Sequence, residues 1–408
     1  MNTPNIRFKG FGGDWEQRKV GDITGRTYGG GTPKTDIDEY WEGDIPWIQS
    51  SNLTEHQLFD VDIQKHVTEK GLQKSATQLV PANSIAVVSH VGVGKLVYMP
   101  FQYTTSQDFI SLAALKTEPR FTSYAIYKRL QKDMHIVQGS AIKGITKDDL
   151  LSKEISVPVY EEQETVGRYF SNLDNLITLY QRKCDNLKQV KKYMLQKMFP
   201  KQGEKVPEIR FAGFTDDWEQ RKFSDIVDIE RGGSPRPIDK FITQESNGLN
   251  WVKIGDAPTQ GNYITKTAEK IRPEGLSKTR EVHPGDLILS NSMSFGKPYI
   301  MGIDGCIHDG WLLIRNSKRI FDLKFLCVML GTENMLNQYK TMAAGSTVNN
   351  LNKDLVGGTT VVYPQIDEQK KIGEYFSNLD NLITLHQRKS DSLKEMKKYM
   401  LQNMFPNK

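Results

Sequence analysis

The chain has 408 residues, a net charge of +5 and 38% hydrophobic residues, which suffices for the cores of two to three domains. It contains no apolar run of about 18 residues and no apolar signal-peptide core, so we expect a cytoplasmic protein with no membrane span. Its three cysteines lack CxxC spacing, which argues against a disulfide framework or a cysteine zinc site, and the mild positive charge fits both a polyanionic partner and an ordinary basic protein.

An extended arm at the start of the sequence recurs as the linker between two halves. Residues 6–23 and 209–226 are identical at 13 of 18 positions, with an offset of 209 − 6 = 203. We therefore expect the arm and the linker to dock at equivalent places, with the chain termini close together. Trp15 and Trp218 follow within the motif DWEQRK, and we expect them to pack inside the protein.

The region after each arm reads as a mixture of strands, loops and a helix. Residues 45–53 and 84–99 are rich in β-branched side chains between turn signals, which predicts strands. Residues 121–134 space their apolar side chains as an amphipathic helix does. Residues 227–363 repeat the plan of residues 24–159 with little identity. Because the flanking segments match so closely, this contrast suggests one scaffold that presents two different binding surfaces.

Each of these regions leads into a long predicted helix. Residues 169–200 and 375–406 are identical at 26 of 32 positions, with an offset of 375 − 169 = 206, and the pattern Pro-x-x-x-Glu-Gln precedes each copy. Apolar side chains recur every seven residues, which predicts that the two helices pair as an antiparallel coiled coil. The predicted helix-pairing residues are Leu173, Leu176, Tyr180, Leu187, Val190, Met194, Leu379, Leu382, His386, Leu393, Met396 and Met400.

Catalytic and metal-binding motifs are missing from the sequence. It contains no GxxxxGK[ST], no GxGxxG after a strand, no HExxH and no GxSxG. Its seven histidines show no ligand spacing, and it has no Pro-Pro of the kind found in the Asn/Asp-Pro-Pro-aromatic motif of amino-methyltransferases. We therefore expect a non-catalytic chain without a metal or cofactor of its own, in which His386 helps to fix the register of the helices.

Loops rich in polar and basic residues occur at matching places in both halves. Phosphates are bound by Lys, Arg and Ser side chains, and base edges are read by Arg, Lys, Asn, Gln, Ser and Thr. This inventory fits double-stranded DNA, although it also describes ordinary solvated loops. The candidate DNA-binding residues are Thr32, Lys34, Gln49, Ser51, Asn52, Ser89, His90, Lys95, Ser140, Lys143, Ser234, Arg236, Lys253, Asn291, Ser292, Ser294, Lys297, Ser346, Thr347 and Asn349.

Several motifs occur in the same order along the chain. They are the two tryptophan starts, the loops GGTP at 30–33 and GGSP at 232–235, IPWI at 45–48, GDLILS at 285–290, and the two Pro-x-x-x-Glu-Gln entries into YFSNLDNLI helices. With this order the whole chain resembles the specificity subunit of Type I restriction–modification systems. It departs from that family at residues 83–89, NSIAVVS, where Gly-Asp is usual.

The resemblance implies an α+β fold with two mixed α/β target-recognition domains separated by two long antiparallel helices, arranged as an internal pseudo-twofold duplication. The expected boundaries are 1–160 for the arm and first domain, 161–200 for the first helix, 201–217 for the linker, 218–365 for the second domain and 366–408 for the second helix.

The resemblance also implies a function. Each domain would read one half of a bipartite, asymmetric DNA site, while the helices set the spacer and dock two modification subunits. Those subunits would use S-adenosylmethionine to methylate adenine at N6, and two restriction subunits would use ATP and Mg. Two rival hypotheses are a coiled-coil scaffold for proteins and a self-contained methylating enzyme, which the missing motifs disfavour. The recognised bases do not follow from the sequence.

Overall fold

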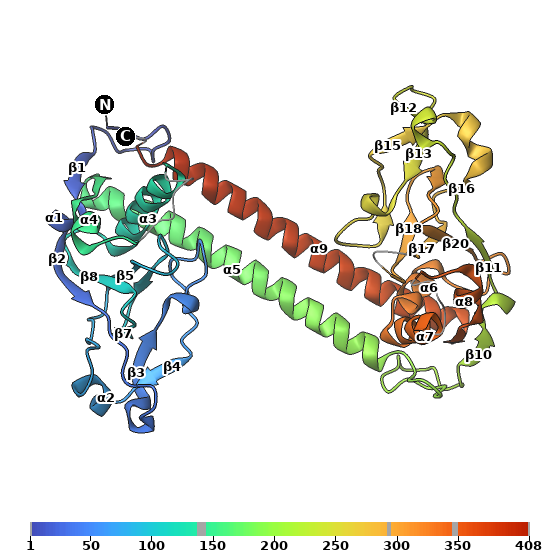
Figure 1. The fold of residues 1–408 in the computed structure, drawn as a ribbon, viewed down its shortest axis with the longest axis horizontal. Coiled ribbons are helices and arrows are strands. Elements are labelled where there is room, and N and C mark those ends of the chain that lie inside the picture. The colour runs from blue at the N-terminus through green and yellow to red at the C-terminus, as the bar shows by residue number, and fades with distance from the viewer. Residues whose placement is uncertain (1, 137–143, 292–294, 345–349, 407–408) are drawn as a thin grey trace. The chain divides into compact units, whose positions relative to one another are not determined.

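The structure is a computed structural model that describes residues 2–136, 144–291, 295–344 and 350–406. The chain divides into a first unit, Met1–Tyr180 with Lys389–Lys408, and a second unit, Gln181–Arg388. Helices α5 (Tyr160–Lys197) and α9 (Ile366–Asn403) each contribute to both units (Figure 1). No helix in the described part of the chain is long and apolar enough to cross a membrane.

The described residues of the first unit form three sheets. Its elements are β1 (Glu16–Lys19), α1 (Val20–Ile23), β2 (Thr24–Gly29), β3 (Trp41–Ile48), β4 (Lys65–Val67), α2 (Glu69–Gln73), β5 (Ser84–Val88), β6 (Leu96–Met99), β7 (Thr104–Thr105), β8 (Phe109–Leu115), α3 (Pro119–Ile136), α4 (Lys147–Ser152) and β9 (Glu154–Val157), with 3-10 turns at Asp38–Tyr40 and Ser50–Asn52. The sheets run β2-β8-β5-β6, β4-β3-β7 and β1-β9.

Strand β5 shows how the sequence divides the core of the first unit. Successive side chains of a strand point to opposite faces of its sheet. Ile85 and Val87 pack in the same cluster as the aromatic side chains of α3, whereas Ala86 and Val88 pack in a second cluster with Ile48 of β3. All residues of this strand are buried, and both faces of the four-stranded sheet are therefore covered.

The second unit contains larger sheets and a second set of helices. Its elements are β10 (Glu219–Lys222), β11 (Asp228–Arg231), β12 (Ile242–Thr243), β13 (Leu249–Val252), β14 (Tyr263–Ile264), β15 (Glu269–Ile271), β16 (Arg280–Val282), β17 (Leu287–Ser290), β18 (Pro298–Met301), β19 (Gly305–Ile307), β20 (Trp311–Arg315), α6 (Leu323–Leu330), α7 (Glu333–Ala344), α8 (Lys353–Gly358) and β21 (Thr360–Tyr363), with 3-10 turns at Phe223–Asp225, Ile238–Lys240, Ile254–Asp256 and Pro273–Lys278. The sheets run β11-β20-β17-β18-β14, β12-β15-β13-β19-β16 and β10-β21.

The core of the second unit is divided in the same way. In β17, Leu287 and Leu289 pack in one cluster with Phe325 of α6, and Ile288 packs in another with Val252 of β13. The two units therefore share a plan in which a central sheet, antiparallel except for the β14–β18 pair of the second unit, lies between helices and a second sheet. This arrangement confirms the predicted α+β class.

Helices α5 and α9 pack together in both units, and they run antiparallel. In the first unit Asp174 of α5 forms an ion pair with Lys397 of α9 at 2.5 Å. In the second unit Lys191 of α5 pairs with Asp380 of α9, also at 2.5 Å. Because 174 + 206 = 380 and 191 + 206 = 397, the same pair forms twice, as an internal twofold repeat requires.

The structure buries the predicted helix-pairing residues to different extents. Leu173, Leu379 and Leu393 are buried, while Tyr180, Leu187, Met194, His386 and Met400 are half-buried. Four predicted seam residues are instead exposed by 42–48%, namely Leu176, Val190, Leu382 and Met396. The second row runs one position later, through Ile177, Cys184 and Lys191 and their counterparts Ile383, Ser390 and Lys397. Each row contains both apolar residues and a lysine, Lys183 in the exposed row and Lys191 in the buried row, so hydrophobicity alone does not identify the buried row.

The arm and the linker dock on the helix ends in the same way. In the first unit the backbone N–H of Ile6 donates to the carbonyl of Asn403 at 2.9 Å, and in the second unit that of Ile209 donates to Lys197, also at 2.9 Å. A carbonyl at the end of each helix, which has no partner within that helix, thus accepts a hydrogen bond. The linker supplies the donor for α5, and the arm supplies it for α9. The expectation of equivalent docking is confirmed.

A buried ion pair fixes the arm in each unit. Arg7 makes two hydrogen bonds to Glu162 at 2.8 and 2.7 Å, and Arg210 makes two to Glu368 at 2.7 and 2.8 Å. The glutamate side chains are 0% and 1% exposed, so each needs a fully hydrogen-bonded partner. This contact explains the glutamate in the Pro-x-x-x-Glu-Gln pattern.

The glutamine of that pattern ties the start of each long helix to the helix that covers the sheet. Gln163 accepts from the backbone N–H of Glu118 at 2.9 Å and donates to Pro158 at 2.8 Å. Gln369 repeats both bonds with Asp322 and Pro364, at 3.0 and 2.9 Å. The pattern therefore fastens the start of each long helix to its own unit by hydrogen bonds.

Candidate nucleic-acid interface

Four described segments of the first unit meet through backbone hydrogen bonds. The loop after β2 joins the end of β7, since Gly31 N donates to Thr105 O at 2.8 Å. The loop after β5 joins the same turn, since Ser89 N donates to Asp108 O at 2.7 Å. Ile145 N in turn donates to Ser89 O at 2.7 Å, which brings the segment before α4 to this junction.

The second unit forms the same junction from equivalent residues. Gly233 N donates to Ile307 O at 3.2 Å, and Asn291 N donates to Gly310 O at 3.0 Å. Leu351 N closes the set by donating to Asn291 O at 3.0 Å. Gly233 corresponds to Gly31, and Asn291 corresponds to Ser89. Both pairs are 202 residues apart, since 233 − 31 = 202 and 291 − 89 = 202. The backbone framework of the candidate interface is thus duplicated although its sequence is not.

Side chains at the junction differ between the units. Thr32 donates its hydroxyl hydrogen to Oε1 of Gln107 at 2.7 Å, and Ser234 donates to Oδ1 of Asp309 at 2.9 Å. The same offset relates both members, since 32 + 202 = 234 and 107 + 202 = 309. We call Thr32–Gln107 and Ser234–Asp309 the junction pairs. One framework therefore presents a neutral amide in the first unit and a carboxylate in the second.

Asp309 organises more of its surroundings than Gln107 does. Its Oδ1 lies 2.9 Å from Nε2 of His308, while Nδ1 of His308 accepts from Gly310 N at 2.9 Å. With Nδ1 accepting, the proton of a neutral His308 is on Nε2 and faces the carboxylate. The carbonyl of Asp309 also accepts from the side chain of Asn291 at 2.8 Å, and Arg236 lies 3.8 Å from Oδ2. Asp309 thus connects the loop that carries Ser234 and Arg236 to the loop that carries Asn291.

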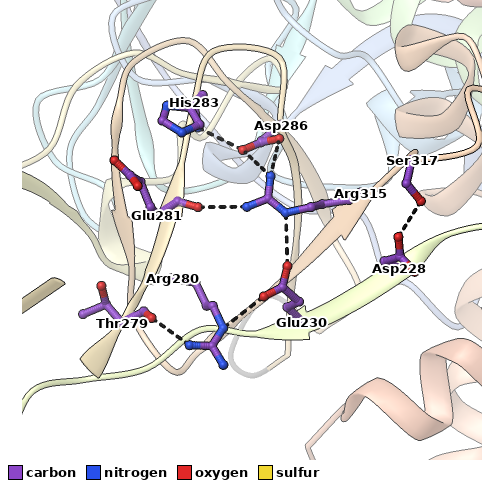
Figure 2. Close-up of polar contacts among 9 residues, drawn as sticks. All are labelled: Asp228, Glu230, Thr279, Arg280, Glu281, His283, Asp286, Arg315 and Ser317. Atoms are coloured by element: carbon purple, nitrogen blue, oxygen red, sulfur yellow. Dashed lines mark hydrogen bonds and ion pairs between the residues drawn. The ribbon is translucent and has the colours of Figure 1, made fainter. Parts of the chain in front are cut away.

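An ion-pair network holds the strand that leads into this junction in the second unit (Figure 2). Arg315 of β20 contacts Glu230 of β11 at 3.1 Å and Asp286 at 3.3 Å, and it donates to the carbonyl of Glu281 in β16 at 3.2 Å. Arg280 of β16 contacts Glu230 at 3.1 Å. The network links β11 and β20 of one sheet to β16 of the other, so it fixes the base of the loop that carries Ser234.

Some predicted DNA-binding side chains make hydrogen bonds within the protein. Asn52 is buried and caps the turn at Gln49, and the hydroxyl of buried Ser89 donates to Asp108 O at 2.8 Å. Lys95 donates to the carbonyl of Leu53 at 3.0 Å. These groups shape the loops around the junction of the first unit. In the second unit Asn291 is buried, Lys253 pairs with Glu269 at 2.6 Å, and Lys297 lies 4.9 Å from the ring centre of Tyr299.

Other predicted residues are exposed. Thr32, Lys34, Ser51, His90 and Arg236 are exposed, and Ser234 is half-buried. Ser140, Lys143, Ser292, Ser294, Ser346, Thr347 and Asn349 lie outside the described residues. Sequence reasoning missed Gln107 and Asp309, although the offset of 202 that relates Thr32 to Ser234 would have paired them.

Two buried thiols of the second unit are unreactive, and the junctions present polar groups. Burial raises the pKa of the Cys306 thiol to about 11 and that of Cys327 to about 12, so both thiols stay protonated and unreactive near neutral pH. Within the described ranges, His, Cys, Asp and Glu form no group of three that could hold a metal ion. The junctions instead offer hydroxyl, amide, carboxylate and guanidinium groups, which suit hydrogen bonding to a polar ligand.

Known proteins similar to this chain point to one family. The sequence matches the family model described as the Type I restriction modification DNA specificity domain at residues 12–189 and 215–395. The MjaVIII specificity subunit of Methanocaldococcus jannaschii is 23% identical over 412 residues, which is 97% of this chain and 93% of that protein. The MjaIX specificity subunit of the same organism is 27% identical over 242 residues, so this chain spans about half of its length, 53%.

Solved structures agree on the fold. The crystal structure of the S subunit of a Type I restriction–modification system from M. genitalium has a TM-score of 0.66 at 14% identity, and the match covers 100% of both chains. A chain from a structure that addresses complex assembly and conformational transition of the type I R-M system has a TM-score of 0.52 at 16% identity, with 96% and 98% covered. The family model matches twice and covers most of the sequence. The chain therefore belongs to the DNA specificity subunits of Type I restriction–modification systems, the non-catalytic components of these complexes.

Proposed function

We propose that each unit reads one half of a bipartite, asymmetric site on double-stranded DNA. The observation that carries the proposal is the duplicated junction, in which equivalent backbone bonds hold different side chains. A fixed framework with exchanged polar groups is what two half-sites of different sequence require, because base edges are distinguished by their donors and acceptors. The exposed Lys34 and Arg236 beside these junctions would add contacts to DNA.

We further propose that α5 and α9 set the spacer between the half-sites and dock two modification subunits. Each unit carries an exposed apolar set on these helices, with side chains 42–60% exposed. The first set is Leu176, Leu179, Met396 and Tyr399, and the second set is Leu382, Leu385, Val190 and Tyr193. The offset of 206 relates the two sets residue by residue. Equivalent apolar surfaces support two copies of one partner.

The chemistry of the complex belongs to its partners in this proposal. The modification subunits would use S-adenosylmethionine to methylate adenine at N6, and two restriction subunits would use ATP and Mg. This chain would supply only sequence recognition and assembly, in the cytoplasm, where the chromosome is accessible.

The deciding experiment is co-expression of the chain with its modification subunit, followed by genome-wide mapping of N6-methyladenine. We expect one bipartite motif with a fixed gap. Replacing residues 24–159 by the same region of another specificity subunit should change one half-site and leave the other half-site and the gap intact. New methylation that is not bipartite, or none from an assembled complex, would contradict the proposal.

The exposed apolar sets also fit a scaffold that binds only proteins. A salt titration of DNA binding separates the two functions. Neutralised phosphates release counterions, so the affinity of a DNA-binding subunit falls steeply with salt concentration. A scaffold would show no specific DNA affinity at low salt.

A further inference from the structure

The junction pairs place two chemically different side chains at one position of the framework. Gln107 is exposed, and its only hydrogen bond to the described residues is the one that its Oε1 accepts from Thr32 at 2.7 Å. Its amide nitrogen is thus left to donate, while Oε1 retains a second lone pair. A glutamine with both groups accessible can pair with N6 and N7 of adenine in the major groove.

Asp309 occupies the equivalent position as an acceptor only. Its side chain is 32% exposed, and Oδ1 receives the hydrogen bonds of Ser234 and His308. Those bonds hold the carboxylate in place and leave Oδ2 facing Arg236, whose side chain is 82% exposed. A fixed carboxylate oxygen accepts from an exocyclic amine, such as N4 of cytosine. The adjacent guanidinium offsets the repulsion between a carboxylate and DNA phosphates.

We propose that Gln107 and Asp309 are equivalent specificity-determining residues, each reading one base pair of the half-site that its unit recognises. Their difference, an amide against a carboxylate on the same framework, makes the two half-sites unlike. Thr32 and Ser234 act as positioning residues, since each orients the reading side chain through a hydroxyl. The inference rests on the proposed function.

The test uses the full complex of this chain with its modification subunit. Gln107→Ala and Asp309→Asn are mapped for N6-methyladenine, and the binding of each to the parental site and to an unrelated duplex is measured at one salt concentration. Matched controls are Gln102→Ala, an exposed glutamine on the turn after β6, and Asp304→Asn, an acid 77% exposed on the turn after β18.

We expect Gln107→Ala to make one base pair of one half-site degenerate, and Asp309→Asn to alter one base pair of the other. Affinity for the parental site should fall ~5- to ~150-fold, the factor for one base contact of about 1–3 kcal/mol, with unrelated DNA unaffected. Asparagine keeps an oxygen for Ser234, so this variant preserves the junction. Both controls should retain the parental motif.

Two results would overturn the inference while leaving the proposed function intact. One is a bipartite parental motif that neither variant changes. The other is an equal loss of affinity for both duplexes, which would assign these residues to phosphate binding. A parental complex that directs no bipartite methylation would instead refute the proposed function on which the inference rests.

Discussion

Two equivalent ion pairs in the helix seam differ in burial, and this difference predicts different energies. The side chains of Lys397 and Asp174 are 8% and 14% exposed, whereas those of Lys191 and Asp380 are 24% and 23% exposed. Asp174 also accepts from Tyr124 at 2.5 Å. Lys397→Met would leave the buried Asp174 carboxylate without its charged partner and should lower the unfolding free energy by about 3 kcal/mol. Lys191→Met should cost about 1 kcal/mol, because water can solvate Asp380.

Urea unfolding of the full chain measures both values, with Lys192→Met as a control on the exposed side of α5. The control should change stability by less than about 0.5 kcal/mol. Equal costs for Lys397→Met and Lys191→Met would show that burial does not govern these pairs.

Lys128 makes the stability of the first unit depend on pH. Burial lowers the pKa of Lys128 on α3 to about 8, while its ammonium donates to the carbonyl of Phe405 at 2.8 Å. The pKa in the unfolded chain is higher, so between about pH 8 and pH 10.5 the unfolded chain binds more protons at this residue and its contribution to stability rises with pH. Below pH 8 the full cost of burying the charge remains.

Lys128→Met should therefore gain stability relative to the parent at pH 7, and this advantage should shrink steadily as the pH rises from about 8 towards 10.5. Unfolding free energies of both proteins at pH 7, 8.5 and 9.5 test this, since their difference cancels the other titrating groups. A difference that is independent of pH would contradict the lowered pKa.

At the residue scale the sequence predicted types of side chain better than their roles. It indicated polar and basic loops, yet Asn52, Ser89 and Asn291 are buried and serve the loops themselves. Gln107 and Asp309 escaped notice because each follows a very short strand, β7 or β19, with no motif of its own. Hydrogen bonds between distant loops select among polar residues, and no local pattern records those bonds.

At the element scale the seven-residue period gave the pairing of α5 and α9 but not its whole seam. The structure buries or half-buries one predicted row. For the other row, the prediction took the third residue after each member of the first row, whereas the structure buries or half-buries the fourth. The true row includes Lys191 and Lys397, which enter the seam because an aspartate neutralises each. The row left exposed includes Leu176 and Leu382. Apolar residues that a helix pair does not bury are available to a third helix or a partner.

The two exposed apolar sets allow a test of the proposed docking of two modification subunits. Leu176→Glu with Leu179→Glu places two charges in the first apolar set, and Leu382→Glu with Leu385→Glu does so in the second. A desolvated charge disrupts an apolar interface, so each double variant should bind one modification subunit in place of two, and the quadruple variant none. Native mass spectrometry of the complexes counts the subunits.

The exposed positions let the variants keep the stability of the parent, which thermal unfolding verifies. Arg182→Glu with Lys188→Glu, both exposed on α5, controls for the change in net charge. Retention of two subunits by the quadruple variant would place the docking surface elsewhere.

At the scale of the molecule, the duplication visible in the sequence predicted the repeated fold, the antiparallel helices and the equivalent docking of arm and linker. These features follow from segments that match closely, because identical residues satisfy identical contacts. The inserts share too little sequence for the same argument. Their sheets differ, with three strands in β4-β3-β7 against five in β12-β15-β13-β19-β16. The sequence therefore predicted the frame and left the binding surface largely undetermined.

Equivalent docking also predicts that the chain tolerates a circular permutation. The linker spans 209 − 197 = 12 peptide bonds between Lys197 and Ile209, whose carbonyl and N–H form the docking hydrogen bond. If residue 408 were joined to residue 1, the equivalent connection from Asn403 to Ile6 would span 5 + 6 = 11 peptide bonds. One added glycine makes the two connections equal. New ends placed after Gly203, in an exposed turn, break few contacts. The unfolding free energy of this permutant should lie within about 1 kcal/mol of that of the parent, because every docking contact of the arm is retained. The permutant should also direct the same methylation.

A permutant with its new ends between Tyr180 and Gln181 supplies the contrast. It interrupts α5 within the helix and should lose stability and methylation together, since a broken helix forfeits backbone hydrogen bonds and the packing of the seam. If opening the linker were as damaging as opening α5, the linker would be a required element of the fold. The arm and the linker would then be equivalent in their contacts but not in their contribution to stability.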